Sequence, residues 1–185
     1  MSVITDHIVL AGLQEVNDEV NTKKLGVTHI LNVASEIVID RKDYVYKHNG
    51  ISDDHPKNDI TMILDDNVQF MHQAFLTGGK VLVHCYSGVS RSAITVMAYL
   101  VKYQGLSAID AYHKVLARRG IVDPWPNYLR QFQSWSEQQQ PWKLLSAQEL
   151  RQWMQNIDNR LSVLHDMMND LPQKMNGSNT TSNDR

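Results

Sequence analysis

Short apolar runs alternate with segments of helical spacing along the first 140 residues of the chain. A run of about four to eight apolar or alternating residues, bounded by turn residues, is typical of a β-strand. We expect strands at residues 28–33, 44–48 and 81–83, and an edge hairpin within residues 3–13. The uninterrupted run at 81–83 predicts a buried strand.

The segments between these strands repeat their apolar residues at the spacing of an amphipathic helix. The longest one covers residues 59–76 and ends before Gly78 and Gly79. Its apolar positions are Ile60, Ile63, Leu64, Val68, Met71 and Phe75. Further helices are predicted at residues 92–100, 107–118 and 127–139, and a weaker one at 16–25, which stops at Gly26.

Strands and helices that alternate in this way indicate an α/β fold, with a central, mostly parallel sheet flanked by helices. Folds of this kind bind their ligands at the carboxyl ends of the strands. The loop that follows the strand at 81–83 is therefore expected to lie at the ligand-binding edge of the sheet.

Composition narrows the classes of function. The net charge is −2 and the sequence pI is about 6.4, which gives no electrostatic reason to expect a nucleic-acid or membrane partner. The chain holds one cysteine, so it has no internal disulfide, and the N-terminus lacks the pattern of a signal peptide. We expect a cytoplasmic protein, with the nucleus as an alternative.

The only cysteine stands in a loop that carries candidate chemistry, His84-Cys85-Tyr86-Ser87-Gly88-Val89-Ser90-Arg91-Ser92. A short loop between a strand and a helix directs backbone N–H groups and the helix N-terminus into one concavity, which can bind a tetrahedral dianion. These groups and a nearby guanidinium stabilise the thiolate, so Cys85 is expected to be a nucleophile.

The neighbouring residues fit the same chemistry. Arg91 can donate two hydrogen bonds to two phosphoryl oxygens, and Ser92 can donate to the sulfur as it leaves a phospho-cysteine. His84 is expected to orient the loop and support the thiolate. The loop interior is expected to bind the substrate phosphate together with Arg91; it consists of Tyr86, Ser87, Gly88, Val89 and Ser90.

The motif His-Cys-x5-Arg-Ser resembles the signature of cysteine-dependent phosphatases, and its version here resembles the dual-specificity protein phosphatases of the atypical, stand-alone type. Residues 26–34, 107–112 and 118–119 are similar to other segments of that family, and the resemblance spans about residues 5–140. It implies hydrolysis of phosphotyrosine and phosphoserine or phosphothreonine in phosphoproteins, without a cofactor or metal.

Two other functions remain open at this point. One is a phosphoinositide or RNA 5′-phosphatase of the same mechanism, although the loop interior lacks the lysines common in phosphoinositide-specific relatives. The other is a phosphoprotein-binding module with little turnover.

The resemblance also implies a general acid on a loop about thirty residues before the cysteine. Asp54 lies 31 residues before Cys85 and five before Asp59, as the family pattern requires. Asp53 is the alternative, because a shift of one residue would exchange the two. Asp59 itself is expected to cap the helix that begins at Ile60 and Thr61.

Two segments leave alternatives. Arg118 and Arg119 can bind a second substrate phosphate, as basic residues do in some relatives, or complement a helix dipole. Relatives commonly carry Pro-Asn-x-Gly-Phe where this chain has Pro124-Trp125-Pro126-Asn127-Tyr128. Either Pro124 or Pro126 can be aligned with the proline of this pattern. Whether the segment supports the catalytic loop as in relatives is therefore undecided at this point. If Trp125 is exposed, we expect it to line the mouth of the pocket.

The remaining residues predict three parts: a dual-specificity phosphatase catalytic domain at 1–140, a C-terminal amphipathic helix at 141–172 and a disordered polar tail at 173–185. Seven apolar residues of the second part recur at heptad spacing. They are Leu150, Met154, Ile157, Leu161, Leu164, Met168 and Leu171. This seam favours a homodimer through the helix, with docking on the chain's own catalytic domain as the alternative.

Overall fold

The computed structural model describes residues 1–39, 41–53, 59–139, 151–152, 155–160 and 162. Its contacts divide the chain into two units, Met1–Leu144 and Leu145–Arg185. None of the helices within the described ranges is long and apolar enough to cross a membrane.

Five strands among the described residues form one sheet in the order β1-β2-β5-β3-β4. The strands are β1 (Ser2–Thr5), β2 (Ile8–Ala11), β3 (His29–Ala34), β4 (Val45–Ile51) and β5 (Val81–His84). β1 pairs with β2 in the antiparallel sense, whereas the pairs β2–β5, β5–β3 and β3–β4 are parallel. The predicted edge hairpin and the mostly parallel sheet are confirmed, and β5 lies at the centre.

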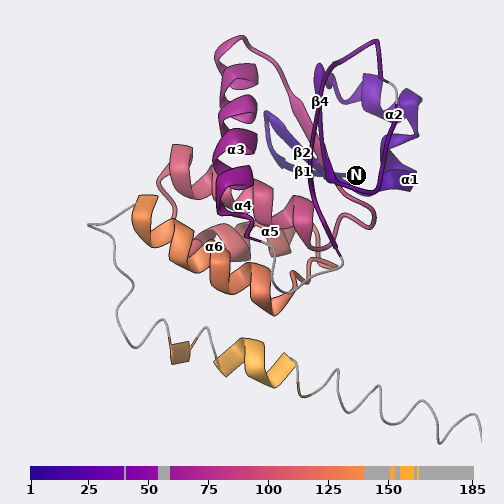
Figure 1. The fold of residues 1–185 in the computed structure, drawn as a ribbon. Helices are drawn as coiled ribbons and strands as arrows, with labels where there is room; N and C mark the ends of the chain where they lie inside the picture. The colour runs from indigo at the N-terminus through magenta and orange to yellow at the C-terminus, as the bar shows by residue number, and fades with distance from the viewer. Residues whose placement is uncertain (40, 54–58, 140–150, 153–154, 161, 163–185) are drawn as a thin grey trace, which may run out of the picture. The chain divides into compact units, whose positions relative to one another are not determined.

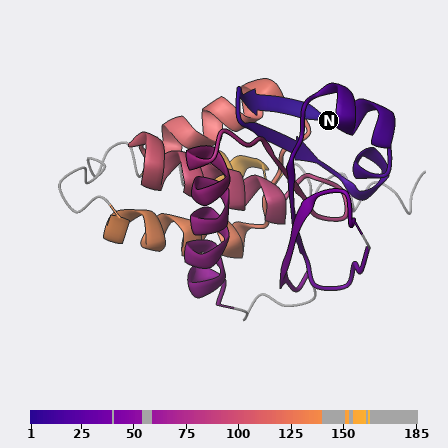
Figure 2. The ribbon, with the colours of Figure 1, turned by 90° about the horizontal axis from the view of Figure 1, so that it is seen from above.

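Helices cover both faces of the sheet. Their bounds are α1 (Leu13–Val16), α2 (Glu19–Lys24), α3 (Thr61–Leu76), α4 (Arg91–Gln104), α5 (Ala108–Arg118) and α6 (Pro126–Gln139). The helices α3 to α6 lie on one side of the sheet, and the short α1 and α2 lie on the other (Figures 1 and 2).

Side chains that alternate along the strands build the two halves of the core. Val9 of β2, Ile30 of β3 and Leu82 of β5 pack in one cluster with Val16 and Val27 on the α1–α2 side. The residues next to them in each strand point to the opposite face, toward α4. These fully buried residues are Leu10, Leu31 and Val83.

Most predicted helices are confirmed with shifts of a few residues at their ends, but the one expected at residues 16–25 is not continuous. The chain forms α1 and α2 instead, because Asp18 interrupts the helix and its side chain caps α2 by accepting a hydrogen bond from Asn21 N at 3.0 Å. The N-cap position of the long helix is Ile60, so the expected cap by Asp59 is wrong by one residue, although Asp59 Oδ1 accepts a hydrogen bond from Thr61 N at 2.9 Å.

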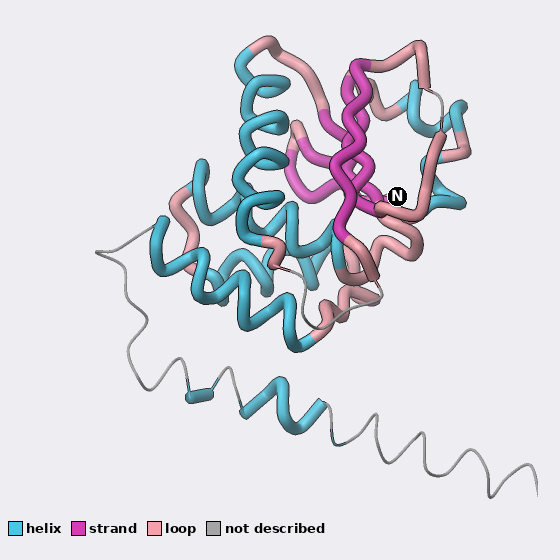
Figure 3. Tube along the Cα trace, in the orientation of Figure 1, coloured by secondary structure: helices cyan, strands magenta, loops and turns pink. Residues whose placement is uncertain are grey.

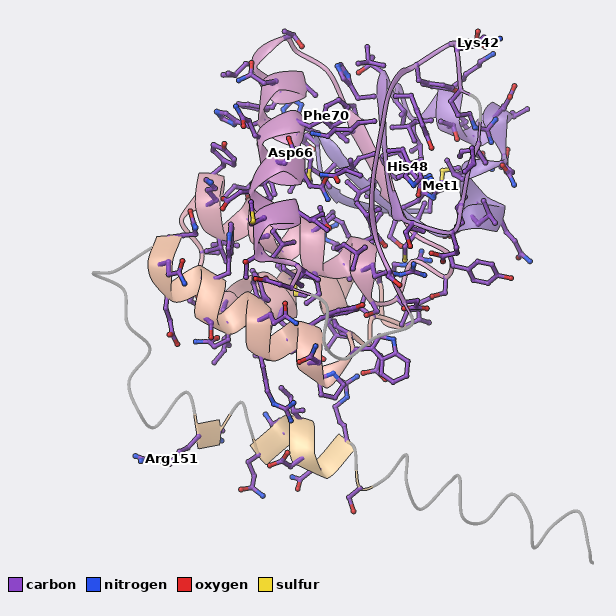
Figure 4. The ribbon with its side chains drawn as sticks, viewed as in Figure 1. Met1, Lys42, His48, Asp66, Phe70 and Arg151 are labelled. Carbon is purple, nitrogen blue, oxygen red and sulfur yellow. The ribbon has the colours of Figure 1, made fainter. Side chains whose placement is uncertain are left out.

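The edge strand β4 is held to α3 by polar and aromatic contacts. Lys47 Nζ lies 2.7 Å from Asp66 Oδ1 and 5.7 Å from the centre of the Phe70 ring. Asp66 and Phe70 lie one turn apart on the same helix (Figure 4). Because α3 is tied to β4 in this way, the carboxyl end of β4 has a fixed position beside the central strands.

The second unit contains helical residues at 151–152, 155–160 and 162 (Figure 3). The amphipathic helix predicted at 141–172 stays a prediction, because most of that range lies outside the described residues. Of the heptad seam, Ile157 is described and is partly exposed, while the other six positions lie outside the described residues.

Candidate active site

The loop of residues 85–90 connects the central strand β5 to α4, so it lies at the carboxyl edge of the sheet. The loops after β2, β3 and β4 begin at the same edge, because these strands run parallel to β5. This topology brings groups from distant parts of the sequence around the cysteine.

Cys85 is 1% exposed, and its sulfur faces polar groups. Sγ accepts a hydrogen bond from Gly88 N at 3.3 Å and lies 3.2 Å from Ser92 Oγ. Ser92 is in the first turn of α4, where the partial positive charge of the helix N-terminus favours an anion. These groups stabilise a thiolate, and they agree with the predicted contact between the hydroxyl and the sulfur.

Arg91 is 2% exposed, and its guanidinium is fixed by oxygen atoms from two other loops. Nη1 donates to Glu36 Oε2 at 2.7 Å and to the Ile51 carbonyl at 3.1 Å, and Nη2 lies 3.3 Å from Asp53 Oδ2. Burial opposes the charge, but the hydrogen bond to Glu36 and the nearby negative groups, Cys85 included, raise the pKa of Arg91. The site therefore holds a permanent cation beside Cys85.

Glu36 is a site residue that the sequence analysis missed. It follows β3 by two residues, so it lies at the same edge of the sheet as the loop. Its hydrogen bond with Arg91 outweighs partial burial and lowers the pKa of the carboxyl group. The signal in the sequence was an acidic residue shortly after the strand predicted at residues 28–33.

Of the two candidates for the general acid, only Asp53 belongs to the described residues. Asp54, the favoured candidate, lies outside the described residues. Asp53 is described, and its carboxylate is paired with Arg91. The assignment of the general acid to Asp54 stays a prediction, while Asp53 already has a different partner.

His84 is fully buried at the end of β5. Its Nδ1 lies 3.2 Å from the carbonyl oxygen of Cys85, so this nitrogen is the donor in the pair. Burial lowers the pKa of His84 to about 4, and the ring is therefore neutral at pH 7. Nε2 has no hydrogen-bond partner in the described part of the chain. These contacts support the predicted role of orienting the loop.

Gly88 occupies a position that admits no other residue. Its φ is +69°, which L side chains rarely adopt, and an added Cβ would lie 2.6 Å from the Ala11 carbonyl. The backbone of the loop can therefore pack directly on the end of β2. Of the other loop residues, Tyr86 and Ser87 are exposed, whereas Ser90 is buried.

The segment before α6 supports the catalytic loop although it departs from the family pattern. Asp123 N donates to the Val89 carbonyl and Trp125 N donates to Ser90 Oγ, both at 3.1 Å. Both donors are backbone groups, so this support does not depend on whether Pro124 or Pro126 aligns with the family pattern. The Trp125 side chain is 58% exposed, and its position at the mouth of the pocket stays a prediction.

Arg118 and Arg119 have different surroundings. Arg118 is exposed, whereas Arg119 is 8% exposed and forms hydrogen bonds with Glu15 and with the catalytic loop. Arg118 lies in the last turn of α5, as the helix-dipole alternative requires, whereas the Arg119 guanidinium hydrogen-bonds to Glu15 and to the loop. Glu15 was missed as a site residue, and the contact of Arg119 with the loop was not predicted, because contacts across about a hundred residues leave no local pattern.

The described residues contain no group of three or more His, Cys, Asp or Glu side chains that could hold a metal ion. The site is thus built from a buried cysteine, a hydroxyl, a fixed guanidinium and backbone N–H groups. Such a set can bind a phosphate monoester and transfer its phosphoryl group to sulfur.

Comparison with known proteins agrees with this chemistry. Residues 9–138 match the family described as dual specificity phosphatase, catalytic domain. The chain is 33% identical over 138 residues to dual specificity protein phosphatase 1B of Arabidopsis thaliana, covering 74% of this chain and 82% of that protein. It is 38% identical over 125 residues to the protein-tyrosine-phosphatase MKP1 of the same plant, covering 66% of this chain but only 16% of that protein.

A solved structure shows the same fold. The crystal structure of human DUSP28 matches with a TM-score of 0.72 at 26% sequence identity, covering 76% of this chain and 99% of that chain.

Proposed function

The chain belongs to the dual-specificity phosphatase family of cysteine-dependent protein phosphatases, and we propose that Cys85 is the nucleophile with which it hydrolyses phosphotyrosine and phosphoserine or phosphothreonine. The observation that carries this proposal is the environment of Cys85 Sγ. The sulfur accepts a backbone N–H and faces a hydroxyl, and the charged Arg91 follows in the same loop.

In the first step, the Cys85 thiolate attacks the phosphorus of the bound monoester. The bond from phosphorus to the ester oxygen breaks, and the leaving oxygen takes a proton from the general acid, for which we propose Asp54. The backbone N–H groups of the loop balance the charge on the phosphoryl oxygens, and the Arg91 cation, whose Nη atoms are held by Glu36, Ile51 and Asp53 in this structure, contributes through its charge. The product is a phospho-cysteine and a free hydroxyl group.

In the second step, water attacks the phospho-cysteine. The carboxylate of Asp54 accepts a proton from this water, and the bond from phosphorus to sulfur breaks. Ser92 Oγ, 3.2 Å from the sulfur, donates a hydrogen bond to the departing thiolate. Inorganic phosphate leaves, and the enzyme returns to its starting form without a cofactor or metal.

Two exposed aromatic residues support a protein substrate. Tyr86 is 63% exposed and Trp125 is 58% exposed, and the backbone of each belongs to or contacts the catalytic loop. Large aromatic side chains beside a phosphate site suit the apolar parts of a phosphopeptide better than a strongly anionic lipid headgroup. The loop interior also has no lysine for additional phosphates.

We also propose that the chain has three parts. Residues 1–140 form the catalytic domain, residues 141–172 form a helix that mediates homodimerisation, and residues 173–185 form a polar tail. The helical residues at 155–160 support the second part, and docking of this helix on its own catalytic domain is the alternative. A cytoplasmic location remains a proposal that rests on the single cysteine.

Phosphate release from a matched panel tests the substrate class. The panel holds a phosphotyrosine peptide, a phosphothreonine peptide, a phosphoinositide and 5′-triphosphate RNA, each assayed with the native chain and with Cys85→Ser. We expect turnover of both peptides that the substitution abolishes. A preference for lipid or RNA would overturn the substrate class, and binding of the peptides without any turnover would favour a phosphoprotein-binding module.

A further inference from the structure

The carbonyl oxygens of the catalytic loop are held by hydrogen bonds, as is the sulfur of Cys85. Each carbonyl oxygen from Cys85 to Ser90 has a hydrogen-bond donor. In chain order the donors are His84 Nδ1, Leu13 N, Arg119 Nη2, Arg119 Nε, Asp123 N and Ile94 N. Two of these six oxygens depend on one side chain, that of Arg119.

Arg119 reaches the loop from the end of α5. Nε donates to the Gly88 carbonyl at 2.9 Å, and Nη2 lies 3.3 Å from the Ser87 carbonyl. The guanidinium also forms a two-point ion pair with Glu15, from Nη1 to Oε1 at 3.1 Å and from Nη2 to Oε2 at 2.7 Å. A lysine could not make these four contacts at once.

Glu15 ties this cation to the strand β2. Its Oε2 also accepts a hydrogen bond from Gly12 N at 2.7 Å, directly after the strand. Partial burial opposes ionisation, but the hydrogen bonds from Arg119, from the N-terminal ammonium group and from Gly12 lower the pKa of Glu15 to about 2. The ion pair is therefore present over the whole pH range in which the enzyme would act.

The geometry of the peptide group links this outer pair to the reacting atom. The Ser87 carbonyl and the Gly88 N–H belong to one planar trans peptide, so they point in opposite directions. Arg119 binds the oxygen of this peptide, and Cys85 Sγ accepts its N–H at 3.3 Å. By the same rule, the bond to the Gly88 carbonyl directs the N–H of Val89 to the opposite side.

We propose that Arg119, fixed by Glu15, is a positioning residue that holds two consecutive peptide groups of the catalytic loop with their N–H groups toward the thiolate and the phosphate. The inference rests on the proposed role of Cys85 as the nucleophile. Arg119 is 8% exposed, with its donors used by the loop and Glu15, so it acts through the backbone and does not touch the substrate.

Alkylation of Cys85 by iodoacetamide tests this proposal without requiring turnover. Cys85 is the only cysteine, so the rate reports on one thiol. In Arg119→Met, we expect the pH at which alkylation reaches half its maximal rate to rise by about one unit, because an oriented N–H that favours the thiolate is lost. Inorganic phosphate or vanadate should also protect the thiol less well.

Turnover of an aryl phosphate supplies a second readout. One oriented backbone donor contributes roughly 10²-fold to reactions that develop charge, so Arg119→Met should lose about that factor in kcat, with a smaller rise in KM. The kcat of Arg119→Lys should lie between that of the native chain and that of Arg119→Met. Added guanidinium ion should restore part of the activity of Arg119→Ala, which a general loss of folding would not allow.

Two further variants make the outcome decisive. Arg118→Met removes the adjacent, exposed arginine and should leave unchanged both the alkylation profile and the turnover of the aryl phosphate, which has no second phosphate for Arg118 to bind. Glu15→Gln keeps the size of the side chain but removes its charge, and should shift the profile in the same direction by a smaller amount. If Arg119→Met unfolds, Glu15→Gln provides the same test.

An alkylation profile unchanged in both folded Arg119→Met and Glu15→Gln would overturn the proposal. A native chain without turnover, in which Arg119→Met still shifts alkylation and phosphate protection, would instead contradict the proposed function and leave the positioning role intact.

Discussion

Acidification should weaken the folded state through His84 more than through any exposed histidine. The side chain is fully buried, and burial lowers its pKa to about 4, compared with 6.5 for an ordinary histidine. Between these two values the unfolded chain binds a proton and the folded chain does not. The free energy of unfolding therefore falls as the pH drops below 6.5, and this loss is complete below about pH 4.

The size of the effect follows from the same two values. Between pH 7 and pH 5, the titration of His84 should remove about 2 kcal/mol from the free energy of unfolding. Urea unfolding of the native chain and of His84→Asn at both pH values measures it. Asparagine does not titrate, and its side-chain N–H can still donate to the Cys85 carbonyl.

Other groups titrate in the same range, so the comparison is between variants. They contribute equally to both proteins, and the difference between the two pH-induced losses isolates His84. The exposed His113 provides a matched control, since His113→Asn should lose as much stability as the native chain. If His84→Asn loses as much stability as the native chain between pH 7 and pH 5, the assignment of a buried neutral imidazole is wrong.

Three further perturbations test the proposed chemistry and assembly. Asp54→Ala should lower kcat roughly 10²- to 10⁴-fold with poor leaving groups and much less with good ones; the same pattern in Asp53→Ala would move the acid by one residue. Ser92→Ala should slow breakdown of the phospho-cysteine about tenfold to a hundredfold, seen as a larger burst in stopped-flow assays, because the leaving sulfur loses a donor. Removal of residues 146–185 should yield a monomer in sedimentation, and an unchanged mass would favour docking of the helix within one chain.

The pattern of apolar residues predicted the mostly parallel sheet and the helices α3 to α6, because these helices repeat their apolar residues at helical spacing and the strand at 81–83 is apolar throughout. The burial of β5 and the placement of Cys85, Arg91 and Ser92 around one loop followed from the apolar run, the motif and the rule for parallel sheets, whereas the central position of β5 in the strand order was not predicted. The break between α1 and α2 was not foreseen, because Asp18 acts as a cap in competition with a weak helical pattern.

Contacts between side chains of distant segments could not be predicted from the sequence. Glu36 pairs with Arg91 across 55 residues, and Glu15 pairs with Arg119 across 104. Both acids follow predicted strands at the carboxyl edge of the sheet, so their general location could be inferred. Which cation each one binds depends on side-chain packing that has no local periodicity.

A covalent intermediate on Cys85 is the central claim, and mass spectrometry of the enzyme quenched during turnover tests it most directly. With a phosphotyrosine peptide or an aryl phosphate as substrate, the account predicts a phosphoryl group on the peptide that contains Cys85, formed faster than the steady-state rate and absent from Cys85→Ser. Turnover that persists in Cys85→Ser, or turnover without this adduct under conditions where it should accumulate, would contradict the mechanism.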